Sequence, residues 1–94
     1  MARIEITRAA AEDISRLRVT HSLPPDTGER IKASLRALEQ FPRLGTALEG
    51  PEWAGFRFLL GPWRWMVIVY EVLDDGERVV VVTVQDGRSS SAAN

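Results

Sequence analysis

The 94-residue chain contains no cysteine and only one histidine. A disulfide framework, a catalytic thiolate and a cysteine-based zinc site are therefore excluded, and a single histidine cannot form a multi-histidine metal site. Neither a GxGxxG sequence nor a P-loop motif is present, so we expect no cofactor and no metal. The lack of cysteine suits a reducing compartment, which favours a cytoplasmic protein. No run of about 18 apolar residues occurs, which argues against a membrane partner.

An excess of charge of one sign is also missing. Twelve basic residues oppose thirteen acidic residues, which leaves a formal charge of −1 at pH 7. A near-neutral chain is not a typical strongly basic nucleic-acid-binding domain. Lysine is almost absent as well, because Lys32 is the only one among the twelve cations. Guanidinium groups bind phosphate and carboxylate in a bidentate manner, so we expect any functional cation here to be an arginine.

The remaining composition is that of one globular domain, with 45% hydrophobic and 27% charged residues. We expect a single domain over residues 1–88, followed by a disordered polar tail over residues 89–94. A chain of this size builds one core and leaves little room for a deep enclosed pocket.

The first third of the chain predicts a strand and then a helix. Residues 2–7 alternate between apolar and polar side chains, as a half-buried strand does. Residues 9–18 change to helical spacing, with an apolar stripe toward the core and Asp13 in solvent. His21 follows in a loop without residues placed to form a catalytic triad, so we interpret it as a solvated loop residue.

A second helix is predicted to begin after Asp26, which is placed to cap it, with Glu29 completing a capping-box-like pair. Pro42 ends this helix. Its apolar residues recur at helical spacing and consist of Ile31, Leu35, Leu38 and Phe41. The glycine-rich stretch over residues 45–55 is predicted to be a loop.

The second half of the chain predicts three strands at residues 56–60, 64–73 and 78–84. Asp74-Asp75-Gly76-Glu77 forms the hairpin turn between the last two, because Asp-Gly tolerates the positive φ values that such turns need. The predicted order is β-α-α-β-β-β, an α+β domain with two helices on one face of a small antiparallel sheet. A parallel strand pair, or a failure of the last two strands to pair, would count against the family resemblance described below.

One segment is unusual in its side chains. Residues 53–70 hold six of the seven aromatics, the two cations Arg57 and Arg64, and no acidic residue. Aromatics interleaved with cations bind phosphates and stack on bases, whereas the alternative is that the aromatics form the core. Both interpretations stay open for Trp63 and Trp65. The candidate partner-binding residues are Trp53, Trp63 and Trp65.

A third arginine, Arg88, follows the last predicted strand. If that strand has no bulge, Arg88 shares a face with Arg78 and Val84. Arg57, Arg64 and Arg88 are therefore candidates to converge on one face or end of the sheet.

Several short motifs together resemble the RelE/ParE superfamily of bacterial type II toxins. The resemblance covers residues 2–88. The matching pieces are Ala10-x-x-Asp13-Ile14, Leu38-x-x-x-Pro42-x-x-Gly45, Gly55-Phe56-Arg57-Phe58-Leu59, Val67-Ile68-Val69-Tyr70-Glu71-Val72, and Val82-Thr83-Val84 leading to Gly87-Arg88.

The resemblance implies a toxin that a cognate antitoxin neutralises. ParE-like members bind and poison DNA gyrase, whereas RelE-like members cleave mRNA on the ribosome with arginine and lysine and without metal. The antitoxin segment is expected to fold on binding, as an amphipathic helix over the sheet or beside the two helices, or as an added edge strand. We expect an exposed apolar strip for it that includes Trp63 or Trp65.

The catalytic pattern of RelE-like enzymes is matched only in part. Arg57 fits a basic position, but Val67 occupies the place of an arginine three residues before Tyr70, and no aromatic follows Tyr70 to match a late tyrosine. We therefore favour ParE-like inhibition of gyrase. The alternative is a metal-free mRNA endonuclease with Arg57, Arg64 and Arg88 as catalytic candidates, and the second alternative is an inactive relative or a small protein-binding module.

Overall fold

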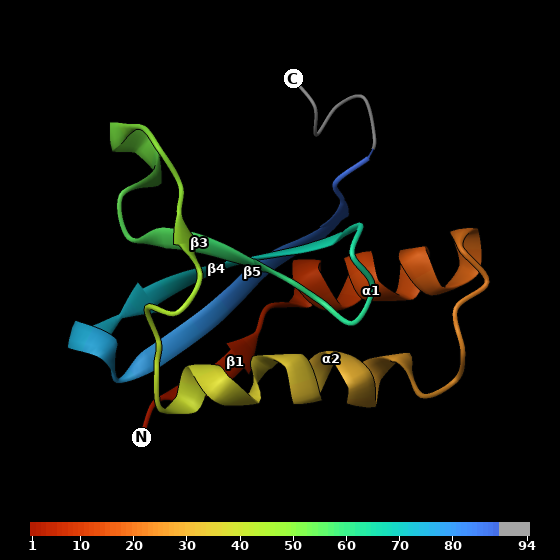
Figure 1. Ribbon diagram of the computed structural model, residues 1–94, viewed down its shortest axis with the longest axis horizontal. Helices are drawn as coiled ribbons and strands as arrows, with labels where there is room; N and C mark the ends of the chain where they lie inside the picture. Colours follow the sequence, from red (N-terminus) through yellow and green to blue (C-terminus); the bar gives the residue numbers. More distant parts are fainter. Residues whose placement is uncertain (89–94) are drawn as a thin grey trace.

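The fold consists of two helices packed on one face of a five-stranded sheet (Figure 1). The computed structural model describes residues 1–88, so the tail predicted at 89–94 lies outside the described residues. Within the described part, neither helix is both long and apolar enough to span a membrane. The elements are β1 (Arg3–Ile6), α1 (Arg8–Thr20), α2 (Thr27–Leu35), η1 (Arg36–Glu39), β2 (Thr46–Ala47), η2 (Pro51–Trp53), β3 (Phe56–Leu60), β4 (Met66–Leu73), η3 (Asp74–Gly76) and β5 (Arg78–Asp86).

The strands lie in the order β1-β5-β4-β3-β2. The α+β arrangement and the pairing of β4 with β5 are confirmed, and β2 is a short extra strand inside the stretch predicted as a loop. The expectation of a wholly antiparallel sheet was wrong at one edge, because β1 pairs with β5 in parallel. Turn sequences between consecutive strands reveal hairpins, but nothing local reveals the partner of a strand that two helices separate from the rest.

Thr7 joins β1, α1 and β5. Its hydroxyl oxygen accepts a hydrogen bond from the backbone N–H of Ala10 at 3.1 Å and so caps α1. The same hydroxyl donates to the carbonyl oxygen of Val81 at 2.9 Å. The start of α1 is thereby fixed against the central strands of the sheet.

Strand β5 contains a bulge that Asp13 of α1 stabilises. Tyr70 of β4 faces Val81, whereas Val69 faces Thr83, so Val82 is the extra residue. One carboxylate oxygen of Asp13 accepts hydrogen bonds from the Thr83 hydroxyl at 2.7 Å and from the backbone N–H of residue 84 at 3.2 Å. The prediction that Asp13 lies in solvent was wrong, because the bulge turns these donors toward α1.

The apolar face of α2 is buried as predicted for Ile31, Leu35 and Leu38, which are 0–2% exposed. Phe41 is 61% exposed, so its assignment to this face was wrong. The α-helix ends at Leu35 and continues as the tighter η1, which changes the helical phase beyond it.

The predicted cap of α2 was also wrong. Asp26 makes no side-chain cap hydrogen bond, because its backbone has φ −87° and ψ 14° instead of the extended conformation that capping requires. Its carboxylate instead accepts a hydrogen bond from Arg30 at 3.0 Å.

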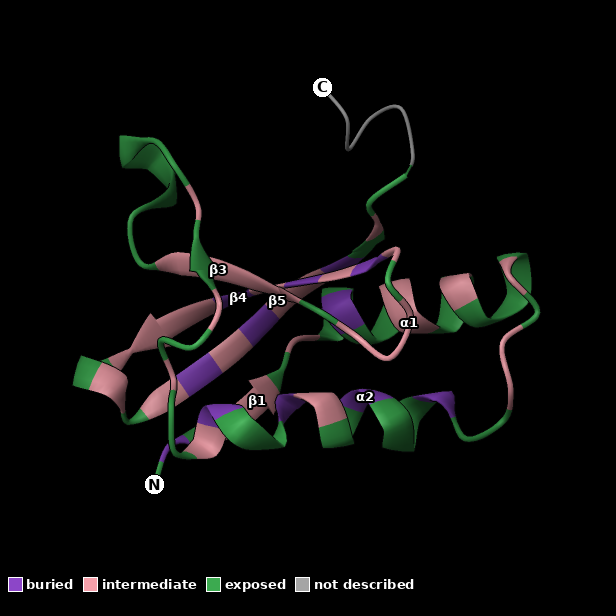
Figure 2. Ribbon diagram, viewed as in Figure 1, coloured by how far each residue is buried: buried purple, intermediate pink, exposed green. Residues whose placement is uncertain are grey.

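The core lies between the helices and β4–β5 (Figure 2). Tyr70 is its largest fully buried side chain, as expected for a core aromatic. Its hydroxyl oxygen accepts a hydrogen bond from the backbone N–H of Gly45 at 2.8 Å. Burial raises the pKa of the Tyr70 phenol. A Cβ at position 45 would lie 2.5 Å from the Phe58 carbonyl oxygen and 2.7 Å from the Tyr70 hydroxyl oxygen, so only glycine fits there.

We expect Gly45→Ala to lower the free energy of unfolding by about 2 kcal/mol, because the added methyl group overpacks against backbone and a buried phenol. The matched control is Gly28→Ala, since a Cβ at position 28 meets nothing within 4 Å. That control should stabilise the chain by up to about 1 kcal/mol. Chemical denaturation measures both, and equal effects would contradict the packing argument.

We expect Asp13→Ala to lower the free energy of unfolding by about 1–3 kcal/mol, because the Thr83 hydroxyl and a bulge N–H lose their acceptor. Glu12→Ala is the control, because Glu12 is exposed and its carboxylate makes only a long surface ion pair, with 4.0 Å to the Nε of Arg8. The same denaturation measurement distinguishes them. If Asp13→Ala lowers the free energy of unfolding no more than Glu12→Ala does, Asp13 does not stabilise the bulge.

Candidate functional site

Arg57 binds the loop that leads into β2. Its Nη1 donates hydrogen bonds to the carbonyl oxygens of Arg43 at 3.0 Å and Gly45 at 2.7 Å. The Tyr70 hydroxyl oxygen accepts a hydrogen bond from the Gly45 N–H, so both the N–H and the carbonyl oxygen of Gly45 are bound by side chains of the sheet. The Arg57 guanidinium therefore has a structural task on the loop that leads into β2.

Arg64 and Arg88 lie together at one end of the sheet, away from that loop. The backbone N–H of Gly87 donates to the carbonyl oxygen of Trp65 at 2.7 Å, which joins the end of β5 to the β3–β4 loop. Arg64 is exposed in this loop and not on β4, where it was predicted, because β4 begins at Met66. The structure thus brings two of the three candidate arginines together and separates Arg57 from them.

The two tryptophans of the β3–β4 loop belong to a group of stacked side chains, here called the indole cluster. Trp63 and Trp65 are stacked with ring centroids 6.3 Å apart, and the ring of His21 stacks on Trp65 at 4.3 Å. Guanidinium groups complete the cluster: Arg30 lies 5.7 Å from the centroid of Trp63 and Arg88 lies 5.3 Å from that of Trp65. Both indoles are half-buried, so neither is fully enclosed.

His21 is a member of this cluster that sequence reasoning missed. Its side chain is 24% exposed, and its Nε2 lies 2.9 Å from the Asp86 carboxylate, so the interpretation as a solvated loop residue was wrong. Arg88 donates to the same carboxylate through its side chain and backbone, and with His21 it lowers the pKa of Asp86. No local signal links residues 21 and 86. Among residues 1–88, no three potential metal ligands converge, and this pair has no third ligand.

Trp53 lies apart from the indole cluster on η2. It is 43% exposed and makes an edge-to-face contact with Phe56, with ring centroids 5.5 Å apart. Other exposed large apolar side chains are Met1, Ile6, Val19, Phe41, Leu44 and Leu60. The apolar strip that was predicted to include Trp63 or Trp65 stays a prediction.

The face of the sheet opposite the helices has a shallow hollow of about 270 Å³. Met66, Ile68 and Tyr70 point into the core, so Val67 and Val69 point to this open face. The residues that line the hollow are Leu48, Phe58, Val67, Val69, Gln85 and Gly87. Within the described part of the chain, no cation lines it.

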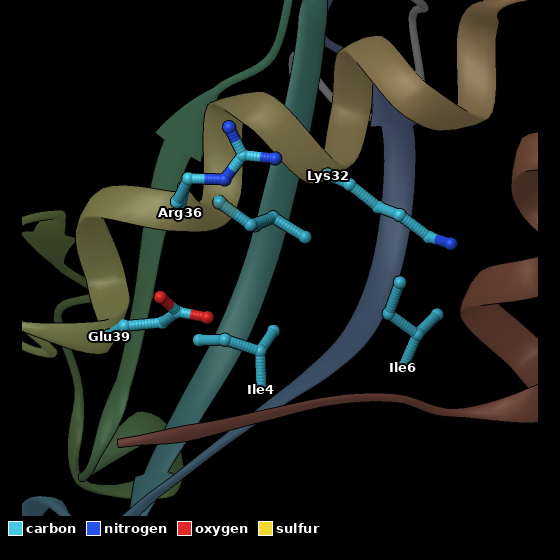
Figure 3. A pocket seen from close by; sticks show the side chains of 6 residues that line it. Ile4, Ile6, Lys32, Arg36 and Glu39 are labelled. Atoms are coloured by element: carbon cyan, nitrogen blue, oxygen red, sulfur yellow. The ribbon is translucent and has the colours of Figure 1, made fainter. Parts of the chain in front are cut away.

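A groove of about 290 Å³ runs between β1 and the α2–η1 segment (Figure 3). Ile4, Ile6 and Leu35 supply its apolar surface, and Lys32, Arg36 and Glu39 supply its charges. Neither Lys32 nor Arg36 forms an ion pair within residues 1–88. We call this site the β1 groove.

The backbone of β1 also leaves an edge beside this groove. Arg3 and Thr7 direct their N–H groups at carbonyl oxygens of Glu77 and Val81, so the residues between them at even positions direct theirs away from β5. Ala2 follows this pattern, because its N–H reaches the Glu39 carbonyl oxygen of η1 at 2.7 Å. Ile4 and Ile6 therefore present both apolar side chains and a strand edge that no other strand of residues 1–88 pairs with.

The family comparison agrees with this architecture. A family model described as the ParE toxin of a type II toxin–antitoxin system, parDE, matches residues 4–90. The chain belongs to the ParE toxin family. No curated protein matches it significantly.

Solved structures of RelE and ParE-type toxins share the fold of this ParE-family chain. The isolated Escherichia coli RelE toxin is 18% identical with a TM-score of 0.66, over 99% of this chain and 93% of that one. A chain of the intact E. coli RelBE toxin–antitoxin complex is 16% identical with a TM-score of 0.67, over 95% of this chain and 100% of that one. The YoeB/ParE toxin from Agrobacterium tumefaciens is 21% identical with a TM-score of 0.64, over 92% and 98%. The parallel β1–β5 pair therefore does not count against the family.

We expect the indole cluster of this ParE-family chain to stabilise the fold in a pH-dependent way through Asp86. A carboxyl group whose pKa is lowered by folding stabilises the fold above its unfolded pKa, about 3.9, and this stabilisation is lost as the pH falls through the folded value. The difference in melting temperature between wild type and Asp86→Asn should be largest near pH 7 and shrink below pH 4. Glu49→Gln, in an exposed loop, is the control. A difference that stays constant down to pH 2 would contradict this role.

Proposed function

We propose that this type II toxin arrests growth by binding DNA gyrase without cleaving nucleic acid, and that a cognate antitoxin neutralises it. The observation that supports this proposal best is the chemistry of the open sheet face. Its hollow is lined by apolar side chains, glycine and the amide of Gln85, with no cation among the described residues. Such a surface suits contact with a protein, because apolar area drives protein association.

The same face is poorly equipped for RNA cleavage. Metal-free cleavage requires cations placed where negative charge develops on the scissile phosphate. Val67 occupies the position where RelE-like enzymes are expected to carry an arginine, and the Nη1 of Arg57 already donates to two carbonyl oxygens. The open-face hollow therefore lacks the preorganised positive charge that this mechanism demands.

A second candidate function is ribosome-dependent mRNA cleavage. The observation in its favour is the proximity of Arg64 and Arg88, which are both exposed at one end of the sheet. Exposed guanidinium groups bind phosphates well. However, both lie at the rim of the indole cluster and outside the open-face hollow, so they do not surround a common substrate cavity.

The β1 groove is the site that we assign to the antitoxin. Its apolar floor and strand edge suit an extended or helical segment with apolar side chains. Lys32 and Arg36 at its rim form no ion pair within residues 1–88 and outnumber the single acidic residue there, Glu39, which favours a segment that also carries acidic residues. The RelB antitoxin peptide in the solved structure of one E. coli RelE variant is a precedent for such a binding segment in a protein of this fold.

The target is tested with purified toxin in two assays, DNA supercoiling by gyrase and cell-free translation of a defined message. We expect supercoiling to be inhibited while the message stays intact. Cuts within codons on the ribosome that disappear in Arg64→Ala or Arg88→Ala would instead establish the endonuclease. A chain that arrests no growth when expressed alone would show an inactive relative or a simple binding module.

The antitoxin site is tested by charge reversal in the groove. We expect Arg36→Glu to weaken antitoxin binding about tenfold or more, because an attractive contact becomes repulsive. Arg18→Glu is the matched control, since Arg18 is exposed on α1, lies outside the groove and changes the net charge equally. Calorimetric titration measures both affinities, and toxicity without antitoxin should stay unchanged in both. Equal affinities would refute the assignment of the groove.

A further inference from the structure

The charge balance around the indole cluster leaves Arg64 uncompensated. Arg30 lies 3.0 Å from the carboxylate of Asp26, and Arg88 lies 3.2 Å from that of Asp86. Arg64 stands between the two tryptophans in sequence, is exposed, and forms no ion pair or side-chain hydrogen bond within residues 1–88. Its positive charge is therefore available to a partner.

The loop that carries Arg64 is held firmly, so the guanidinium is presented on a rigid base. The N–H of Gly61 and the carbonyl oxygen of Met66 close the loop at 2.9 Å, and the Trp63 carbonyl accepts the Met66 N–H at 2.9 Å. On either side of Arg64, the indoles stack against one another and against His21. A rigid anchor loses little conformational entropy when it binds, which favours a contact at this site.

The indoles themselves are not open to a nucleic-acid base. Trp63 has Trp65 on its ring and Arg30 over it, and Trp65 has Trp63, His21 and Arg88 as neighbours. Single-stranded nucleic acid is bound by stacking of bases on accessible aromatic faces. Because the cluster uses these faces internally, the chemistry left at its surface is hydrogen-bond donation by guanidinium groups, which carboxylates accept in a bidentate manner.

We propose that the β3–β4 loop and the adjoining end of β5 form a charged part of the surface that contacts the toxin's protein target, with Arg64 binding an acidic segment of that target. Arg88, which lies over the ring of Trp65, belongs to the same end of the sheet. The inference rests on the proposed function, in which the toxin acts by binding a protein. It goes beyond that function by adding a charged contact at the rim of the sheet, which adjoins the open-face hollow at Gly87 and lies outside the β1 groove.

The test compares Arg64→Glu, Arg64→Lys and the control Arg8→Glu. Arg8 has a side chain that is 96% exposed at the start of α1, and its reversal changes the net charge equally. Growth arrest on induction is measured first, since it does not depend on the identity of the target. Binding to purified DNA gyrase and to a single-stranded RNA homopolymer is then measured at low and high salt. Melting temperatures confirm that all variants fold.

We expect Arg64→Glu to weaken growth arrest and to lower gyrase affinity about tenfold or more at low salt. Arg64→Lys should lose less, and Arg8→Glu should stay within about twofold of wild type, since a charge distant from an interface contributes little. High salt should reduce the difference in gyrase affinity between wild type and Arg64→Glu.

Three outcomes would overturn the inference in distinguishable ways. If wild type binds gyrase and Arg64→Glu arrests growth and binds equally well, the contact is wrong while the proposed function stands. If Arg64→Glu loses RNA binding but not gyrase binding, the surface serves RNA. If wild type neither arrests growth nor binds gyrase, the proposed function fails, and the inference fails with it. Weakened growth arrest by Arg64→Glu with unchanged RNA binding, and without gyrase binding by wild type, would keep the contact and replace only the target.

Discussion

A single extra residue in β5 determines which side chains of that strand reach the helices. Before the bulge at Val82, odd-numbered residues face the core, and after it Val84 takes their place. The shift directs Asp86 toward α1, where its carboxylate meets His21. Without the extra residue, strand alternation would direct Asp86 to the opposite face. The indole cluster therefore depends on a backbone irregularity that the carboxylate of Asp13 stabilises.

The bulge also explains why a motif in the first helix is linked to one in the last strand. Asp13 and Thr83 belong to two of the short motifs on which the family resemblance rests, and they form a hydrogen bond of 2.7 Å. Gly45 and Tyr70 belong to two other such motifs and are joined in the same way. In both cases the paired residues hold an irregular segment against the sheet. These motifs thus describe how the fold is held together, independently of what it binds.

Much of the fold followed from local patterns in the sequence. The strand at residues 56–60, the hairpin turn at Asp75-Gly76 and the buried stripe of α2 depend on alternation, positive φ values and helical spacing, all of which operate within a few residues. The parallel pairing of β1 depends on contacts more than 70 residues apart in the chain. The role of Asp13 could not be predicted either, because a polar side chain on a helix indicates solvent unless its distant partner is known.

The candidate site was predictable in its residue types but not in its geometry. Abundant arginine near tryptophan was visible in the sequence, and Trp63, Arg64, Trp65 and Arg88 do lie together. The role of Arg57 was not predictable, because the sequence of a strand does not show whether its arginine donates hydrogen bonds to a ligand or to a neighbouring loop. The Arg57 guanidinium donates hydrogen bonds to the carbonyl oxygens of Arg43 and Gly45. Arg57 therefore has a structural role, whereas Arg64 and Arg88 remain candidates for binding.

The molecule has three surfaces of different chemistry around one small core. Among residues 1–88, the β1 groove joins an apolar floor to cations without an ion pair, and the open sheet face has an uncharged hollow. The rim beyond them presents Arg64 on a loop fixed by stacked indoles. Because the groove and the rim do not share a lining residue, charge reversal in one leaves the other intact. An antitoxin bound in the groove would then neutralise the toxin either by extending to the rim, where it competes for Arg64, or by blocking the target sterically.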